Sequence, residues 1–339
     1  MSHPQPALFA EEVPEHLHQE WRLRPGAAAA DVVAAIAAAR RAVTTLGAPM
    51  AVWGFGPELW RTLAPDAIPE RVRSFTGVGS PSVVPVTQAD IWLWCQGTTY
   101  PRLWRAGYDA AAALAPVAER VRWLRAYRGP DSRDPIGFID GTENPAPDEA
   151  MEVALVGDDE PGGGGTTVLL QRWVHDLAAF AALPEAAQER VFGRTYADST
   201  QLAPDELPAT SHVARNTLEA PGGGELPIYR RNTSYAEADE VGTLFIGAAA
   251  EPQRVQTMLE RMFGQSSDGL HDALTRFSRP VSGSTYFVPS MTDLTSVFGS
   301  LAPEDEEDSE SGPAAAVAVD AGRAGSSSSL AIGNLTQGG

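Results

Sequence analysis

Three short segments of the sequence carry residue types that could do acid–base or metal-binding chemistry. The first is 137–145, in which Gly141 follows Asp140 and a second carboxylate, Glu143, comes shortly after. One interpretation is an Asx-type turn, in which Asp140 accepts local amide hydrogen bonds and the glycine takes a positive φ. The other is a carboxylate held on a tight loop over a cleft. Composition alone leaves both interpretations open.

The second segment contains a histidine and the third a pair of arginines. His212 lies between two proline-bearing loops, where helical periodicity does not require it, although a lone loop histidine is more often structural than catalytic. Arg230 and Arg231 precede Asn232, and a solvated surface pair is the simplest explanation of the arginines. A histidine can bind a metal or move a proton near neutral pH, and an arginine supplies a permanent cation with forked donors.

Three other histidines have simpler explanations. His16 and His18 are flanked by glutamates and could form a metal-binding pair, but a solvated helix or coil produces such a pattern more often. Asp176 directly follows His175. We expect this aspartate to cap a helix and the histidine to be structural or exposed.

The composition of the 339 residues excludes several function classes. A net charge of −19 argues against nucleic acid or an anionic membrane surface as the main partner, and no apolar run approaches the ~18 residues of a membrane span. A single cysteine, Cys95, excludes an internal disulfide framework and a multi-cysteine metal cluster. All 25 basic residues are arginines, which excludes mechanisms based on a lysine Schiff base or a P-loop lysine. Residues 1–25 lack the features of a signal peptide, which favours a cytoplasmic location.

The elements that must position these segments repeat in the two halves of the chain. Hydrophobic periodicity predicts helices at 27–43, 58–63, 108–127, 178–191 and 253–263, and strands at 50–56, 89–96, 167–173, 242–248 and 284–288. The proline- and aspartate-rich segment 129–149 is predicted to be irregular. Similar strand–helix patterns in both halves favour an α+β fold with two related open sheets over a parallel α/β sheet.

The composition changes again near residue 302. Residues 304–310 contain six acids in seven positions, and an alanine-, serine- and glycine-rich stretch without aromatic residues follows. This composition predicts a disordered tether. The tether ends in an apolar segment, 330–335, which would be unusual if nothing bound it.

Considered together, four segments resemble the signatures of the dye-decolorising peroxidases, a haem family. They are 137–145, which matches the family's signature loop residue for residue, 167–177 with 188–194, 211–215, and 277–283 running into 286–289. These segments occur in the family's order over about residues 5–300, and the compact length resembles the bacterial B-type subgroup.

The resemblance implies two ferredoxin-like domains, each a four-stranded antiparallel sheet with helices. The amino-terminal domain would span 1–145, the carboxy-terminal domain 146–300 would hold one haem b, and 301–339 would be the tether. The implied activity is the reduction of hydrogen peroxide coupled to oxidation of dyes, phenols or other small one-electron donors. The family also implies a homo-oligomer, from a dimer to a hexamer.

The resemblance also assigns roles to individual residues. By position, His212 matches the proximal iron ligand, Asp140 the distal aspartate and Arg230 the distal arginine. Asn232 matches the distal asparagine of B-type members, and Asp272 is the candidate carboxylate that orients His212. In these roles Asp140 would shuttle a proton and Arg230 would stabilise the charge on the departing hydroxide.

The end of the tether, 329–335, resembles the cargo-loading peptides that dock enzymes on the inner wall of encapsulin shells. Leu330, Ile332 and Leu335 would fill apolar pockets, and Gly333 would let the backbone lie close to the shell protein. The implied location is the inside of an encapsulin nanocompartment in the cytoplasm.

Two other functions remain open at this stage. One is a haem-handling protein, which stores or dechelates haem and has weak peroxidase activity. The other is a non-catalytic module that holds a divalent cation at Asp140 and Glu143.

Overall fold

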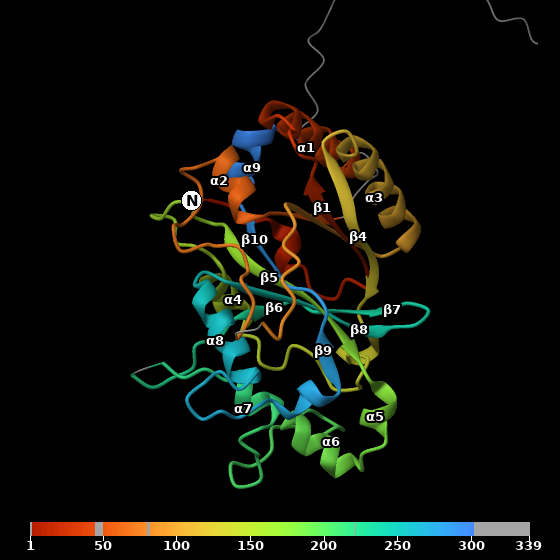
Figure 1. Cartoon of the computed structure of the whole chain (residues 1–339), viewed down its shortest axis with the longest axis vertical. Coiled ribbons are helices and arrows are strands. Elements are labelled where there is room, and N and C mark those ends of the chain that lie inside the picture. Colours follow the sequence, from red (N-terminus) through yellow and green to blue (C-terminus); the bar gives the residue numbers. More distant parts are fainter. Residues whose placement is uncertain (1, 45–49, 80–81, 221, 302–339) are drawn as a thin grey trace, which may run out of the picture. The chain divides into compact units, whose positions relative to one another are not determined.

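Ten antiparallel strands form one sheet, which is the frame of the protein (Figure 1). The computed structural model describes residues 2–44, 50–79, 82–220 and 222–301. The predictions for the acidic tether and its terminal peptide therefore lie outside the described residues. The strand order is β6-β8-β7-β4-β1-β3-β2-β10-β5-β9, and β8 also pairs with β5, so that the eight strands between β6 and β9 close into a ring.

The strands are β1 (Glu15–Leu23), β2 (Met50–Phe55), β3 (Ile91–Gly97), β4 (Ala118–Tyr127), β5 (Thr166–His175), β6 (Tyr229–Arg230), β7 (Thr233–Ala236), β8 (Val241–Ala249), β9 (Ser278–Pro280) and β10 (Ser284–Val288). The α-helices are α1 (Ala29–Thr44), α2 (Pro57–Leu63), α3 (Tyr100–Leu114), α4 (Pro147–Ala154), α5 (Leu177–Ala181), α6 (Glu185–Phe192), α7 (His212–Asn216), α8 (Pro252–Met262) and α9 (Met291–Phe298). Three short 3₁₀ helices are η1 (Pro6–Phe9), η2 (Pro130–Ser132) and η3 (Ala273–Arg276).

β3 shows how the sequence produces this arrangement. Successive side chains of a strand point to opposite faces. Leu93 and Cys95 pack against α1 and α3, whereas Trp92 and Trp94 pack among the side chains inside the ring. Because both faces are buried, the strand is apolar at almost every position.

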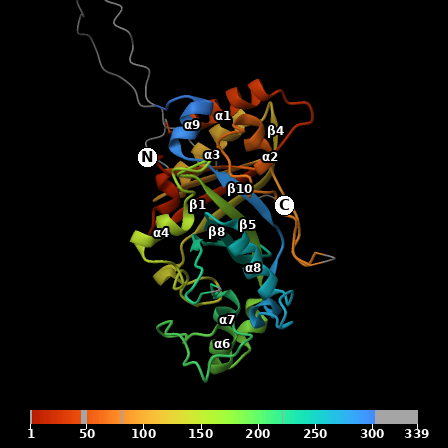
Figure 2. The same cartoon turned by 90° about the vertical axis from the view of Figure 1, so that its left-hand side faces the viewer.

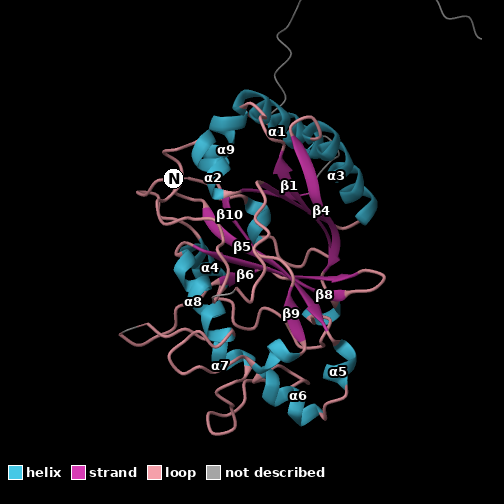
Figure 3. Ribbon diagram, in the orientation of Figure 1, coloured by secondary structure: helices cyan, strands magenta, loops and turns pink. Residues whose placement is uncertain are grey.

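The helices gather at two ends of the ring (Figures 2 and 3). At one end, α1, α2, α3 and α9 cover the amino-terminal strands. At the other end lie α6 and α7, with α8 packed against β5 and β8. The irregular segment 129–146 crosses to this second end, and the predicted site residues lie there. No helix in the described ranges is long and apolar enough to cross a membrane.

Most predicted elements are confirmed, but the helix predicted at 108–127 is wrong in its second half. The helix α3 ends at Leu114, and strand β4 follows, paired with β1 along its length. Pro116 explains the break, because a proline has no amide hydrogen to continue the helix. Single-sequence periodicity could not reveal the cross-strand pairing that stabilises β4 instead.

The predicted solvation of His16 and His18 is also wrong. Both lie in β1, which the sequence analysis did not assign, and the two side chains are buried. His18 hydrogen-bonds Thr233 Oγ1 through Nε2 (3.1 Å), and Trp94 donates from Nε1 to His16 Nδ1 (3.1 Å). Burial lowers the pKa of His16 to about 3, so the ring is neutral.

The helix predicted at 178–191 is two helices, α5 and α6, separated at Pro184. The mixed α/β class with antiparallel pairing is confirmed. The expectation of two separate open sheets is wrong, because the β8–β5 and β10–β2 pairings join the strands of both halves into a single ring. The division into domains at residue 145 stays a prediction.

Candidate active site

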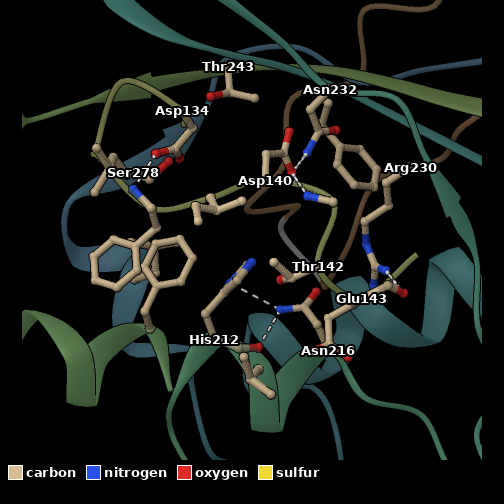
Figure 4. Close-up of a pocket in the computed structure, with 18 of the residues that line it drawn as sticks. Asp134, Asp140, Thr142, Glu143, His212, Asn216, Arg230, Asn232, Thr243 and Ser278 are labelled. Atoms are coloured by element: carbon tan, nitrogen blue, oxygen red, sulfur yellow. Dashed lines mark hydrogen bonds between the residues drawn. The ribbon is translucent and has the colours of Figure 1, made fainter. Parts of the chain in front are cut away.

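The structure brings four predicted site residues together around one cavity. The cavity measures about 970 Å³ when the open space at its mouth is included, and His212, Asp140, Arg230 and Asn232 all line it. Figure 4 shows His212 on one side, with Asp140 and Asn232 facing it from the other. The cavity is therefore a candidate active site with one imidazole opposed to an acid, an amide and a guanidinium.

His212 is the first residue of α7, where its orientation is fixed from behind. Ser211 caps this helix by accepting a hydrogen bond from the amide of Ala214 (3.3 Å). Nδ1 of His212 donates to Oδ2 of Asp272 (2.6 Å). The other ring nitrogen, Nε2, has no hydrogen-bonding partner among the described residues, and the ring points into the cavity (Figure 4). A lone pair on Nε2 is therefore free to bind a metal.

Asp272 has the position expected of a carboxylate that orients a histidine. It is the residue before η3, and its Oδ1 accepts the amide of Leu274 (2.8 Å) while Oδ2 faces the imidazole. The side chain is almost fully buried. Asp272 is thus the N-cap residue of a short 3₁₀ helix.

Asn216 is a functional candidate that the sequence analysis missed. Its Nδ2 donates to the backbone carbonyl of His212 (2.8 Å) and reaches Oδ2 of Asp272 (3.4 Å). The signal was its spacing, since residues four apart share one face of a helix. Asn216 thus restrains both members of the histidine–aspartate pair.

Asp140 combines features of the two interpretations that the sequence left open. Its Oδ1 accepts the amide of Gly141 (2.8 Å), and Gly141 has the expected positive φ of 80°, but the bond reaches the next residue rather than the second one, so it is not an Asx turn. The same oxygen accepts Nδ2 of Asn232 (3.0 Å), and the carboxyl group also lines the cavity. Burial raises the pKa of Asp140, while the hydrogen bonds from Gly141 and Asn232 and the charge of Arg230 oppose this rise.

The amide of Asn232 has a fixed orientation. Its Oδ1 accepts the backbone amide of Ile246 in β8 (3.2 Å), which directs Nδ2 toward Asp140. This side chain therefore presents a donor, rather than an acceptor, to the carboxylate.

Arg230 lies in β6 and is not part of a solvated surface pair. Nη1 donates to the carbonyl of Glu143 (3.2 Å) and Nη2 to Sδ of Met258 (3.6 Å). Asn144 holds its backbone through two hydrogen bonds of 2.8 and 2.9 Å. In the described part of the chain no carboxylate forms an ion pair with this guanidinium, although burial lowers its pKa. The charge of Arg230 is thus available to a bound anion. Arg231 does not fit the expected solvated surface pair either, because its guanidinium lies over the ring of Trp94.

Aromatic side chains form part of the remaining wall of the cavity. Phe138 stacks on Phe192 with ring centroids 4.0 Å apart, and Phe192 contacts His212. His175 is held at both nitrogens by Ser278 (2.8 Å) and Thr243 (2.9 Å), and burial lowers its pKa to about 4. His175 is therefore neutral and structural, as one of the two expectations held, and Asp176 caps α5 as predicted.

Two charged residues, Arg194 and Glu143, also line the cavity. Arg194 and Glu143 form an ion pair, and Nε of Arg194 is buried without a partner in the described ranges. Within the same ranges no group of three or more potential ligands could hold a metal ion. The alternative of a cation held by Asp140 and Glu143 therefore has no ligand set to support it.

The comparisons with known proteins agree with this geometry. A family model described as Dyp-type peroxidase, C-terminal, matches residues 131–293. A dye-decolorizing peroxidase of Rhodococcus erythropolis is 30% identical over 77% of this chain and 78% of its own length. The chain belongs to the dye-decolorising peroxidases. A second member, from Mycobacterium tuberculosis, is 31% identical over 72% of this chain and 74% of its own.

Solved structures of dye-decolorising peroxidases share the fold. The encapsulated DyP-type peroxidase from Mycobacterium smegmatis superposes with a TM-score of 0.81 at 30% identity, covering 87% of this chain and 98% of that one. DyPB from Rhodococcus jostii gives a TM-score of 0.79 at 31% identity, with the same coverage. Variants of that Rhodococcus protein were solved in complex with haem. These structures agree with the B-type assignment.

Proposed function

We propose that the protein is a haem peroxidase that reduces hydrogen peroxide and oxidises small one-electron donors, with haem b in the cavity of Figure 4. One observation carries this proposal: the free Nε2 of His212 faces Asp140, Arg230 and Asn232 across a single cavity. His212 would hold the haem iron, and Asp140 with Arg230 would supply the proton transfer and the charge stabilisation that peroxide cleavage requires.

The residues of the cavity fit a haem. Phe138, Phe192 and Leu274 provide an apolar wall for a flat macrocycle, and His212 offers a neutral nitrogen as the iron ligand. Haem also carries two carboxylates, and the partnerless buried Nε of Arg194 on the same wall can receive one of them. The haem-bound structures of the Rhodococcus relative support this placement.

Bound haem would supply the redox-active iron at which the oxygen–oxygen bond of peroxide breaks. Asp140 moves the proton: its ionised carboxylate takes it from one peroxide oxygen and delivers it to the other. Asn232 and the amide of Gly141 hold the carboxylate in place for both transfers.

Arg230 stabilises the negative charge that develops on the departing hydroxide. Its guanidinium is a preorganised cation in a low-dielectric site, where such stabilisation is strong. No ion pair in the described residues neutralises it, so its charge acts on the bound molecule. Behind His212, the carboxylate of Asp272 holds the proton on Nδ1 and raises the donor strength of Nε2.

The proposal extends to the two domains of the chain and to its oligomeric state. The antiparallel group β4-β1-β3-β2 with α1 and α3 supports a ferredoxin-like unit over 1–145, and β7-β8-β5-β10 with α8 supports a second over 146–300. On this proposal the haem lies mainly in the carboxy-terminal half, and the support is that the second unit supplies His212 and Asp272. We expect the protein to form a homo-oligomer.

We further propose that the tether 301–339 carries the enzyme into an encapsulin shell. The support is the sequence pattern of Leu330, Ile332, Gly333 and Leu335, and the encapsulated relative from Mycobacterium smegmatis. Deletion of residues 325–339 should abolish co-purification with a co-expressed shell protein and leave peroxidase activity unchanged. Unchanged co-purification would contradict the targeting role.

The peroxidase proposal is tested on purified protein loaded with haem. We expect a Soret band, and peroxide-driven dye oxidation that falls by at least about 10²-fold in Arg230→Leu. His212→Ala should also shift the Soret band, because the iron ligand is lost. Haem binding without peroxide-driven turnover would refute the proposal and favour a haem-handling protein.

A further inference from the structure

A second, polar cavity meets the first one at the distal residues. It measures about 1090 Å³ with the open space at its mouth included, and we refer to it as the outer cavity. The residues that line both cavities are Asp134, Asp140, Gly141, Arg230 and Asn232. Asp140 therefore has a neighbour, Asp134, that faces the same two spaces and that the mechanism above does not use.

Asp134 is held in place but lacks a counter-charge. Its Oδ1 accepts the amides of Gly137 (2.9 Å) and Phe138 (3.2 Å), and the amide of Ile136 also lowers the pKa of the carboxyl group by hydrogen bonding. The adjacent Arg133 donates instead to backbone carbonyls, at distances of 2.6 to 2.9 Å. Burial, and then the charge of Asp140, raise the pKa of Asp134 to about 7.

The two carboxyl groups differ in how well they tolerate a negative charge. Asp140 accepts a side-chain amide as well as a backbone amide, and the positive charge of Arg230 lowers its pKa. Asp134 accepts only backbone amides, those of Gly137, Phe138 and Ile136, and no cation lies among the groups that lower its pKa. Because two carboxylates in one buried site resist simultaneous ionisation, Asp140 ionises first and Asp134 keeps the proton.

Other charged and titratable groups around the two cavities do not change the order in which Asp140 and Asp134 ionise. Burial keeps His16 and His175 neutral near pH 7, and Glu143 is paired with Arg194. The remaining groups that line either space are Glu11, Glu12, Tyr127, Arg128, Arg133, His212, Arg230 and Arg231. Of these only His212 and Arg230 line the inner cavity, and the others line the outer cavity alone.

We propose that Asp134 is the proton-holding residue of this site, which receives protons through the outer cavity and supplies them to the inner one. The proposal rests on the peroxidase function above. Reduction of one peroxide to two waters consumes two electrons from the donor and two protons from solution. Asp134 delivers one of these protons from its carboxyl group to the inner cavity, where it ends in product water, and the resulting carboxylate is reprotonated from the outer cavity.

The pH dependence follows from the state of Asp134. The carboxyl group carries its proton below about pH 7 and loses it above that pH. Turnover should therefore fall as the pH rises through about 7. Asp134→Asn keeps an oxygen that can accept the amides of Gly137 and Phe138, but cannot hold a transferable proton.

The first measurement uses the full chain without haem. Infrared titration should show the carbonyl stretch of a protonated carboxyl group that disappears with a midpoint near pH 7. The band should be absent in Asp134→Asn and unchanged in the matched control Asp131→Asn, which alters an exposed carboxylate in the same loop. A band that is missing from the wild type, or that survives in Asp134→Asn, would overturn the proposal whether or not the protein is a peroxidase.

The second measurement uses the haem-loaded enzyme at saturating peroxide and donor. At pH 6, kcat of Asp134→Asn should fall about tenfold, and its decline above pH 7 should disappear. Asp131→Asn should retain the wild-type profile. A wild-type profile in Asp134→Asn would overturn the relay while leaving the peroxidase assignment intact. Absence of dye oxidation in the wild type would instead overturn the peroxidase function itself.

Discussion

The hydrogen bond between Asn232 and Asp140 gives the sharpest prediction about the distal site. In Asn232→Ala, Asp140 loses the donor at 3.0 Å that favours its ionised form. A hydrogen bond to a charged group contributes about 1.5–3 kcal/mol, and one pKa unit corresponds to about 1.4 kcal/mol. The pKa of Asp140 should therefore rise by about 1–2 units beyond the rise that burial already causes.

The direction of this pKa shift determines the pH range in which activity is lost. Only the ionised carboxylate can accept the peroxide proton, so a higher pKa of Asp140 removes activity at acid pH and spares it at alkaline pH. The assay is the second-order rate constant for reaction with peroxide, measured by stopped flow from pH 4 to 9. Below the wild-type pKa we expect a loss of about ten- to a hundredfold, which vanishes well above it.

A second variant separates this effect from damage to the fold. Asn232→Ala also leaves the amide of Ile246 without its acceptor, which can cost about 1–3 kcal/mol of stability. Asn232→Asp retains that acceptor, removes the donor and adds a negative charge, so it should shift the acid limb further with less loss of stability. An acid limb that stays in place in both variants, at normal haem content, would refute the role of Asn232.

Three further predictions test other parts of the molecule. Asp272→Asn should weaken haem binding about 10–100-fold in a haem titration, because His212 loses its orienting carboxylate, and wild-type affinity would contradict that role. Phe138→Ala should lower the free energy of unfolding by about 3–5 kcal/mol in urea, because the stack on Phe192 is lost, and a change below 1 kcal/mol would contradict the packing. Since the pKa of Asp134 is raised from 3.8 to about 7, wild-type stability should decline relative to Asp134→Asn as the pH rises from 4 to 7, by up to about 4 kcal/mol. An equal pH dependence of the free energy of unfolding in the two proteins would refute the raised pKa of Asp134.

Several elements could be predicted because their signals are local. The strand at 91–97 is apolar on both faces, and α8 has a regular apolar stripe. β1 could not be predicted, because its histidines and glutamates look solvated until β3 and β4 bury them. The boundary after α3 carried a local signal, Pro116, but helical periodicity on either side outweighed it.

The sequence by itself determined which chemistry was available. His212, Asp140 and Arg230 are recognisable through the resemblance of their segments to the family, and the absence of lysine can be read directly from the sequence. Only the tertiary structure decided how they act. Asp272 meets His212 across 60 residues, and Asn232 meets Asp140 across 92.

The state of each group also depends on its surroundings. The aspartate Asp134 looks like any other in the sequence, but its pKa depends on burial, on the charge of Asp140 and on an arginine that points elsewhere. These influences on a pKa depend on distances and desolvation in the folded chain, because a charge buried in a low-dielectric cavity is stabilised only by the groups placed beside it.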